Sequence, residues 1–293
     1  SMSEKEFRRF SEFIQAEFGI KMPAGKKTML ESRLQKRLRA LNMTQHKEYE
    51  DYLFSLKGME IELPHLIDVV TTNKTDFFRE PKHFEILYRD IVPKWHKGTT
   101  SRSSFSVWSA GCSTGEEPYT IAMVLEEYQS QQAEIEYSIL GTDISNQVLE
   151  TANRGVYRED RVKEVAPNIR KKYFLRSKDR SKQLVRIVPE IRSRVKFRQL
   201  NFMDDFEFRE KMDVIFCRNV VIYFERPIQE ALFRKFCDRL APNGYLFIGH
   251  SETLGGMDLP LVQHMLQRCT GKLGNTISFT IHRSRYAYSY CGG

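Results

Sequence analysis

Short apolar runs alternate with helical stretches from about residue 103 onward, and this alternation limits the possible folds more than any other feature of the chain. The apolar runs lie at residues 105–108, 137–143, 195–202, 213–219, 244–250 and 276–282. Between them, helical patterns cover residues 116–129, 145–153 and 227–240. Strands and helices that alternate at this spacing form parallel sheets with helices on both faces. We therefore predict an α/β domain over residues 103–293, built on a doubly wound, Rossmann-like sheet.

The first part of the chain departs from this alternation. Residues 1–72 place apolar side chains at helical spacing, which predicts a small all-α N-terminal domain. We expect its helices to be separated by Gly19, by the turn at residues 23–25 and by Gly58. Residues 73–102 then form a linker and a helix that lead into the α/β domain.

Positive charge gathers in two segments. Lys and Arg number 46 against 38 Asp and Glu, a net charge of +8. Residues 154–198 hold 16 basic residues against 5 acidic ones, and residues 21–40 hold 7 basic residues with Glu31 as the one acidic residue. Because the charged segment 177–182 lies between short apolar pairs, we predict a small antiparallel β insertion at about residues 155–198.

Basic segments of this kind bind nucleic acid, an anionic membrane or an acidic protein surface, or they are solvated faces that bind nothing. Their position in the chain has to decide among these possibilities. We expect the basic side of helix 26–41, with Arg33, Lys36 and Arg37, to be free for a partner.

The five cysteines show no CxxC or Cys/His spacing, which argues against a zinc site and against a disulfide framework. No stretch approaches the roughly 18 apolar residues of a membrane span, and the N-terminal residues are too polar for a signal peptide. We therefore expect a cytoplasmic protein that binds no metal and does not insert into a membrane.

The loop after the first strand carries the first candidate site residues. Ligands of doubly wound sheets bind beyond the carboxyl ends of the strands. Here Gly111 and Gly115 would let the backbone approach a ligand, but their spacing is not the dinucleotide fingerprint GxGxxG. Glu116 and Glu117 would repel a pyrophosphate and attract a cation, which favours S-adenosylmethionine over NAD. They could also serve only to stabilise the helix dipole.

Two other strand ends and one linker segment carry polar side chains. Asp143 either binds ribose hydroxyls or caps the next helix, and Asn219 either faces the same crevice or makes a turn. The linker TTNKTDFFRE, residues 71–80, places hydrogen-bonding groups beside two phenylalanines and Arg79, as a segment closing over an adenosyl ligand would. In the alternative interpretation, the phenylalanines are core residues and Arg79 pairs with Glu80 or Glu85.

Five segments in order along the chain resemble the chemotaxis protein methyltransferases of the CheR family: TTNKTDFFRE, WSAGCSTGEEPYTIAM, GTDIS, FCRNVVIYF and LAPNGYLFIGHSE. The resemblance implies a class I methyltransferase sheet and transfer of a methyl group from S-adenosylmethionine to glutamate side chains on the cytoplasmic helical bundle of chemoreceptors. It places the cofactor contacts on Asn73, Thr75, Arg79, Glu117, Asp143, Asn201, Phe202, Asn219 and Val220. It places Arg79 and Tyr223 beside the transferred methyl group.

The implied chemistry suits these residue types. A glutamate carboxylate, with a reference pKa of about 4.3, is already ionised at neutral pH. Attack on a sulfonium methyl group therefore needs no general base, and the enzyme has only to align the reacting atoms. Arg79 would orient the carboxylate by a charge-assisted hydrogen bond rather than activate it.

One feature departs from part of the family. Members that first dock on a receptor's C-terminal pentapeptide use a glycine-bearing loop of the insertion, whereas this chain has no glycine between Gly155 and Gly244. We therefore do not expect pentapeptide tethering.

Two other functions remain possible from the sequence. One is a nucleic-acid methyltransferase, although Asn219 is not followed by the prolines of an NPPY site. The other is a non-catalytic scaffold that senses S-adenosylmethionine.

Overall fold

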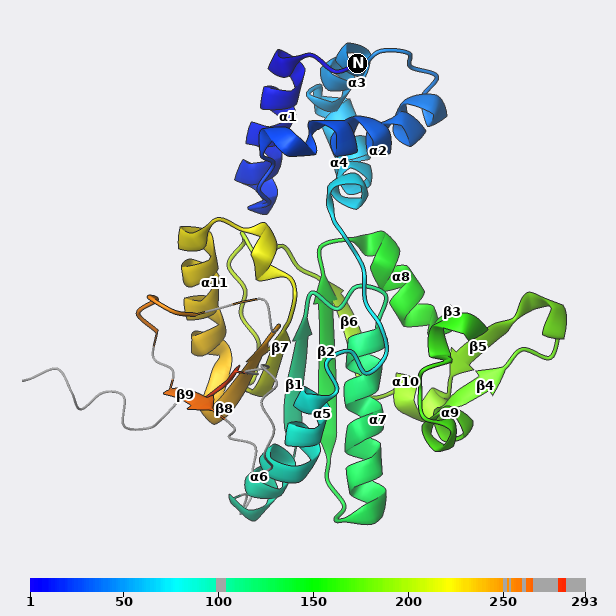
Figure 1. Ribbon diagram of the computed structural model, residues 1–293, viewed down its shortest axis with the longest axis vertical. Helices are drawn as coiled ribbons and strands as arrows, with labels where there is room; N and C mark the ends of the chain where they lie inside the picture. Colours follow the sequence, from blue (N-terminus) through cyan, green and yellow to red (C-terminus); the bar gives the residue numbers. More distant parts are fainter. Residues whose placement is uncertain (99–103, 250–251, 253, 260–261, 266–278, 283–293) are drawn as a thin grey trace, which may run out of the picture.

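The computed structural model describes residues 1–98, 104–249, 252, 254–259, 262–265 and 279–282. A helical domain and an α/β domain are joined by an extended linker (Figure 1). The helical domain contains α1 (Glu4–Phe18), η1 (Ala24–Lys26), α2 (Lys27–Ala40), α3 (His46–Leu53) and α4 (Leu56–Val70). The prediction of an all-α N-terminal region is confirmed. Among the helices that the structure describes, none has the length and apolar character that crossing a bilayer requires.

Local sequence signals set the ends of these helices. At the start of α1, the Ser3 hydroxyl accepts the N–H of Glu6, and the Glu6 carboxylate accepts the N–H of Ser3, which together form a capping box. Gly19 ends α1 in the left-handed conformation, with φ of 71°. Gly58 was predicted to separate two helices, and this prediction is wrong. It lies in the first turn of α4, where its N–H donates to the N-cap residue Ser55.

Two arginines of α2 hold the helical domain together. Arg37 donates to both carboxylate oxygens of the fully buried Glu62 on α4, at 2.8 and 2.6 Å. Arg33 donates to backbone oxygens at the C-terminal end of α4. The prediction that the basic side of this helix is free is therefore wrong for these two arginines, whereas Lys36 and Arg39 are exposed.

The α/β domain is built on a seven-stranded sheet with the strand order β6-β2-β1-β7-β8-β10-β9. Its strands are β1 (Phe105–Ala110), β2 (Tyr137–Asp143), β6 (Val195–Gln199), β7 (Met212–Cys217), β8 (Leu240–Ile248), β9 (Val262–Met265) and β10 (Phe279–His282). Neighbours from β6 to β8 pair in parallel, whereas β10 is antiparallel to both of its neighbours. The predicted doubly wound, mainly parallel sheet is confirmed. Residues 276–278 and His250, at the ends of two predicted strands, lie outside the described residues.

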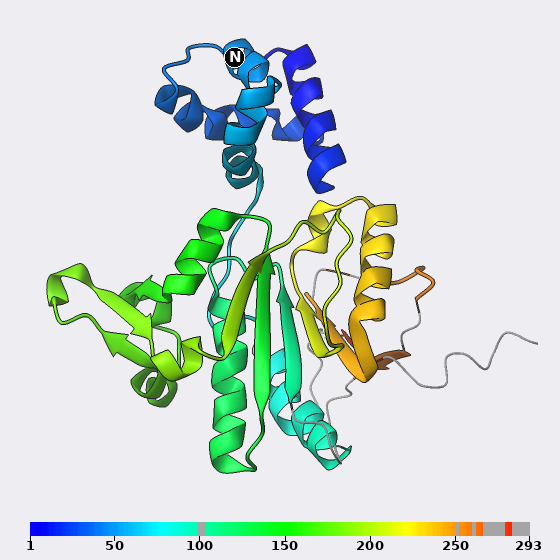
Figure 2. The same ribbon diagram turned by 180° about the vertical axis from the view of Figure 1, so that it is seen from behind.

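Helices cover both faces of this sheet (Figures 1 and 2). One face carries α5 (Lys82–Ile86), η2 (Leu87–Ile91), α6 (Val92–Gly98) and α7 (Glu116–Gln131), which share a core with Phe105 and Phe216. On the opposite face, α11 (Arg226–Arg239) packs Phe236 edge-to-face against Trp108 at 5.1 Å between ring centroids. The helix α8 (Asn146–Arg154) contacts β2 and β6. The core therefore lies on both sides of the central strands, as a doubly wound sheet requires.

The basic insertion forms a second, antiparallel sheet with the order β3-β5-β4. It contains β3 (Val156–Arg158), η3 (Glu159–Val162), α9 (Pro167–Tyr173), β4 (Phe174–Arg176), η4 (Arg180–Lys182), β5 (Leu184–Ile187) and α10 (Pro189–Arg192). The predicted antiparallel insertion is confirmed. It ends earlier than the predicted residue 198, because β6 already begins at Val195 and pairs with β2 of the main sheet.

The linker between α4 and α5 passes the carboxyl ends of the central strands (Figure 1). Phe77 is buried and packs edge-to-face against Tyr157 and Phe174 of the insertion, at 5.0 and 5.3 Å between centroids. Phe78 packs against Phe84 of α5. The core interpretation of these two phenylalanines is confirmed, and the insertion thereby supports the linker from outside the main sheet.

Candidate functional site

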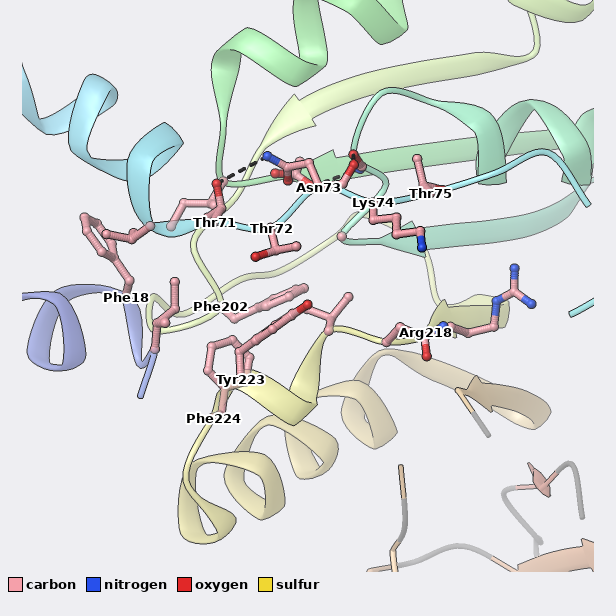
Figure 3. Close-up of a pocket in the computed structure, with 18 of the residues that line it drawn as sticks. Phe18, Thr71, Thr72, Asn73, Lys74, Thr75, Phe202, Arg218, Tyr223 and Phe224 are labelled. Carbon is pink, nitrogen blue, oxygen red and sulfur yellow. Dashed lines mark hydrogen bonds between the residues drawn. The ribbon is translucent and has the colours of Figure 1, made fainter. Parts of the chain in front are cut away.

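A pocket opens between the strand ends, the linker and the C-terminal end of α1. It encloses about 990 Å³, its solvent-filled mouth included. Figure 3 shows linker residues along one side and Phe202, Tyr223 and Phe224 across from them. The pocket is lined by all ten residues that the family resemblance assigns to cofactor or substrate: Asn73, Thr75, Arg79, Glu117, Asp143, Asn201, Phe202, Asn219, Val220 and Tyr223. Its place at the strand ends suits a nucleoside-containing ligand.

The loop after β1 brings backbone directly against the loop after β7. Gly111 has φ of 79°, and a Cβ added there would lie 2.7 Å from Cγ2 of Val220. Real Cβ atoms do not approach carbon so closely, so a larger residue would displace Val220 from the pocket wall. The close approach that Gly111 permits is therefore between two loops that both line the pocket, and the expected approach to a ligand stays a prediction.

Asp143 joins the loops after β1 and β2. Its Oδ2 accepts the backbone N–H of Ser113 at 2.9 Å, and its Oδ1 accepts that of Ser145 at 3.1 Å. The N-cap of α8 is Ser145, whose hydroxyl accepts the N–H of Val148, so the helix-cap interpretation of Asp143 is wrong. Burial raises the pKa of Asp143, while its backbone hydrogen bonds act in the opposite direction.

Glu117 meets the pocket as a paired carboxylate. It accepts the Ser109 hydroxyl at 2.6 Å and the Nε–H of Arg218 at 2.9 Å. The Arg218 side chain is only 3% exposed, and its Nη1 also donates to the backbone oxygen of Arg79 at 2.8 Å. Arg218 therefore ties the end of β7 both to α7 and to the linker.

Glu116 has a different environment from Glu117. It is 1% exposed, does not line the pocket and accepts the hydroxyl of Thr114. Burial raises the pKa of Glu116 to about 7. The predicted pair of carboxylates facing a cationic ligand is thus reduced to Glu117 alone.

The loop after β7 carries Asn219 and Tyr223. Asn219 is left-handed, with φ of 60°, and its amide donates to Oε1 of Glu80 at 3.2 Å. Tyr223 belongs to η5 (Val221–Tyr223), and its backbone oxygen accepts the N–H of Lys21 at 2.8 Å. The ammonium of Lys26 lies 5.7 Å from the centroid of the Tyr223 ring. Positive charge of the helical domain therefore reaches the mouth of the pocket.

Arg79 is partly exposed at the pocket. Its Nη1 donates to the backbone oxygen of Lys74 at 3.1 Å, and it pairs with neither Glu80 nor Glu85. The ion-pair interpretation of Arg79 is therefore wrong. A guanidinium whose one hydrogen-bond partner in the described structure is a carbonyl keeps donors for an anionic ligand.

Asn73 and Thr75 reach the pocket from the exposed linker. The Asn73 amide donates to the Thr71 hydroxyl at 3.3 Å, and its backbone oxygen accepts the hydroxyl of Ser113 at 3.3 Å. The backbone oxygen of Thr75 accepts a hydrogen bond from Arg161 of the insertion. Between Asn73 and Thr75, the linker is thus held by individual hydrogen bonds near the solvent.

The helical domain closes the remaining side of the pocket. The Asn201 amide donates to the backbone oxygen of Glu17 at 2.8 Å, which joins the segment after β6 to the end of α1. Phe202 packs edge-to-face on Phe224, and Phe224 forms an isolated antiparallel bridge with Ile20. The site therefore needs both domains, and one half of the chain would leave it open.

Comparisons with known proteins point to one family. The family model described as "CheR methyltransferase, SAM binding domain" matches residues 73–268. The model described as "CheR methyltransferase, all-alpha domain" matches residues 5–71. The chain belongs to the CheR methyltransferase family. It is 40% identical over 260 residues to the chemotaxis protein methyltransferase of Borreliella burgdorferi, covering 87% of this chain and 90% of that protein. The corresponding Escherichia coli protein is 37% identical over 259 residues, covering 88% of this chain and 87% of that protein.

S-adenosylmethionine is the cofactor of this CheR-family protein. The residues present fit it. Asp143 supplies a buried carboxylate at a strand end, and Gly111 leaves the loop after β1 without a side chain. The prediction of S-adenosylmethionine as cofactor is confirmed by the family match.

Sequence reasoning assigns no role to two charged residues of this site, Arg218 and Glu252. Both lie within segments that carry the CheR resemblance, and both are buried. Arg218 directly follows the apolar strand run of β7, where the chain is still in the core. A charged residue that directly continues a buried strand needs a partner, and this is the signal that would have identified Arg218.

Proposed function

We propose that this CheR-family protein transfers the methyl group of S-adenosylmethionine to glutamate side-chain carboxylates of methyl-accepting chemoreceptors, giving glutamate 5-O-methyl esters and S-adenosylhomocysteine. The observation that carries the proposal is the pocket, which gathers ten predicted residues from five separate segments of a methyltransferase fold. Through its substrate, the enzyme would act in the cytoplasm at receptor arrays, in adaptation of chemotaxis.

The residues that line the pocket would have different roles in binding cofactor and substrate. When bound, S-adenosylmethionine supplies an electrophilic methyl group. Asp143 would accept hydrogen bonds from its ribose hydroxyls, while Asn73, Thr75, Glu117, Asn201, Phe202, Asn219 and Val220 would contact the rest of it. Arg79 and Tyr223 would hold the substrate carboxylate beside the methyl group. Because a glutamate is already ionised at neutral pH, alignment is the main contribution asked of these two side chains.

The test is incubation with methyl-labelled cofactor and a receptor cytoplasmic fragment, followed by base treatment. Methyl esters release the label as methanol, whereas a base-stable label would favour methylation of nucleic acid or amines, and no label would favour a sensor. Arg79→Ala should remove most ester formation while leaving S-adenosylhomocysteine binding largely intact. Arg89→Ala, which changes an exposed arginine away from the pocket, should behave like the unchanged protein. A full-rate Arg79→Ala enzyme would exclude the positioning role.

We further propose that the receptor bundle docks on the exposed basic side of α2 and on the insertion. Lys36 and Arg39 are exposed on α2, and Lys26 at the adjoining end of η1 lies beside Tyr223. Complementary charge accelerates encounter, and salt screens it. The glutamate-rich surface of a receptor bundle is the chemistry that such a basic surface would attract.

Charge reversal at Lys36 and Arg39 tests this docking surface. Changing both to Glu should lower the receptor methylation rate several-fold at low salt and flatten its salt dependence. The same reversal at Lys5 and Arg8, exposed on α1, supplies the matched control. An unchanged rate would identify the α2 surface as merely solvated.

In the same assay, removing a receptor's C-terminal tail should leave the rate of methylation nearly unchanged, because the loop between β4 and β5 contains no glycine.

A further inference from the structure

Glu252 is a buried carboxylate that follows β8 and is only 4% exposed. It accepts four backbone N–H groups. Oε2 accepts those of Asn219 at 3.0 Å and Gly249 at 2.7 Å, and Oε1 accepts those of Val220 at 3.0 Å and Val221 at 2.9 Å. None of the ion pairs between described residues involves Glu252. The hydrogen-bond donors that this carboxylate meets among the described residues are therefore backbone N–H groups.

Three of the four donors are consecutive residues of the loop after β7. Successive N–H groups point to one side of the chain only when the backbone bends, and here Asn219 adopts φ of 60°. The bend is tight against β8: a Cβ added to Gly249 would lie 2.5 Å from Oδ1 of Asn219. The loop thus wraps the Glu252 carboxylate, and it has no room to shift toward β8.

This loop is also a wall of the pocket. Asn219, Val220 and Tyr223 line the pocket, whereas Glu252 does not. Val220 is in addition pressed against Gly111 of the loop after β1. A displacement of the Glu252 contacts would therefore be transmitted to residues that face both the cofactor and the substrate.

We propose that Glu252 is a positioning residue, whose carboxylate fixes the segment from Asn219 to Tyr223 in its binding geometry without touching cofactor or substrate. This inference rests on the proposed function, because it assigns these loop residues to the methyltransferase site. An ionised carboxylate is suited to the role because it only accepts hydrogen bonds. A glutamine of the same shape would turn an NH₂ group toward backbone N–H groups.

Glu252→Gln tests the role. We expect at least about a tenfold weaker binding of S-adenosylhomocysteine by calorimetry, and a lower kcat as well, at a temperature where the variant is folded by circular dichroism. Glu62→Gln is the matched control, because Glu62 is also a buried, multiply bonded carboxylate but lies in the helical domain. It should lower the midpoint of unfolding without changing the affinity for S-adenosylhomocysteine.

Gly249→Ala displaces the same loop from its other side and leaves the charge in place, so it covers the case that Glu252→Gln does not fold. It should weaken S-adenosylhomocysteine binding in the same direction. Folded variants that bind and turn over like the unchanged protein would overturn the inference, as would an affinity loss that Glu62→Gln reproduces. An unchanged protein that binds no S-adenosylhomocysteine would instead contradict the proposed function itself.

Discussion

The pocket has two walls of different construction. The sheet-side wall, formed by the loops after β1, β2 and β7, is held by buried groups: Asp143 joins two loops, and Arg218 pairs with Glu117. The linker wall, residues 71–79, is exposed or half-buried apart from the buried Phe77. Several of its polar contacts lie near the solvent, such as the hydrogen bond from the Asn73 amide to the Thr71 hydroxyl at 3.3 Å, whereas its Arg79 end is held by the buried Arg218.

This difference separates two tasks. Buried, multiply bonded groups keep their geometry whether or not a ligand is present, so the sheet-side wall is preorganised for the cofactor. Exposed hydrogen bonds contribute little free energy, so the part of the linker wall around Asn73 and Thr75 can adjust when a ligand enters. Affinity for the cofactor should therefore depend mainly on the sheet-side wall, and alignment of the substrate on Arg79 of the linker.

The largest effect is expected where the two walls are joined, at Arg218. Arg218→Ala leaves the carboxylate of Glu117 without its cation and frees the backbone oxygen of Arg79. Breaking a buried ion pair by removing one partner lowers the free energy of unfolding by about 3–5 kcal/mol, to be measured by urea denaturation. Lys82→Ala breaks an exposed pair with Glu85 and should change it by about 0.5 kcal/mol or less. Equal losses for the two variants would contradict the buried character of the sheet-side wall.

The contrast between the walls also explains what could be predicted from the sequence. Strand ends and helices follow from apolar periodicity, so the sheet and the site residues Glu117, Asp143 and Asn219 could be placed at one edge. The spacing of apolar residues does not show which charged side chains form ion pairs. Arg218 and Glu117, for example, are 101 residues apart in the chain. The role of Arg218 therefore depends on tertiary structure.

In the basic segments, too, the exposure of each charged side chain depends on tertiary packing. A count of charges treats Arg33 and Arg37 like Lys36, yet the two arginines are bound to α4 and only the lysine is exposed. Likewise Glu116 and Glu117 are neighbours of equal charge, but one is turned into the protein and the other into the pocket. Which face of a helix packs against which neighbour decides these cases, and local composition does not contain that information.

An intermediate effect is expected inside the sheet-side wall, at Asp143. Asp143→Asn replaces one carboxylate oxygen with an NH₂ group that faces a backbone N–H, of either Ser113 or Ser145. A loss of one or two hydrogen bonds to a charged acceptor should weaken S-adenosylhomocysteine binding by roughly 10- to 100-fold. Calorimetry measures the change, and Asp204→Asn, at an exposed aspartate outside the pocket, is the control. Unaltered affinity in Asp143→Asn would remove this carboxylate from the binding site.

The smallest effect is expected at the outer support of the linker wall. Arg161 of the insertion donates to the backbone oxygen of Thr75 and pairs with Asp76 at 3.3 Å, but both side chains are about half exposed, at 41% and 55%. Because solvent screens such a pair, Arg161→Ala should weaken S-adenosylhomocysteine binding only about two- to threefold. Arg158→Ala is the control, since Arg158 pairs with Asp160 within the insertion. If Arg161→Ala instead weakened binding as strongly as Asp143→Asn, the linker would be as firmly built into the cofactor site as the strand ends are, and the division between the two walls would fail.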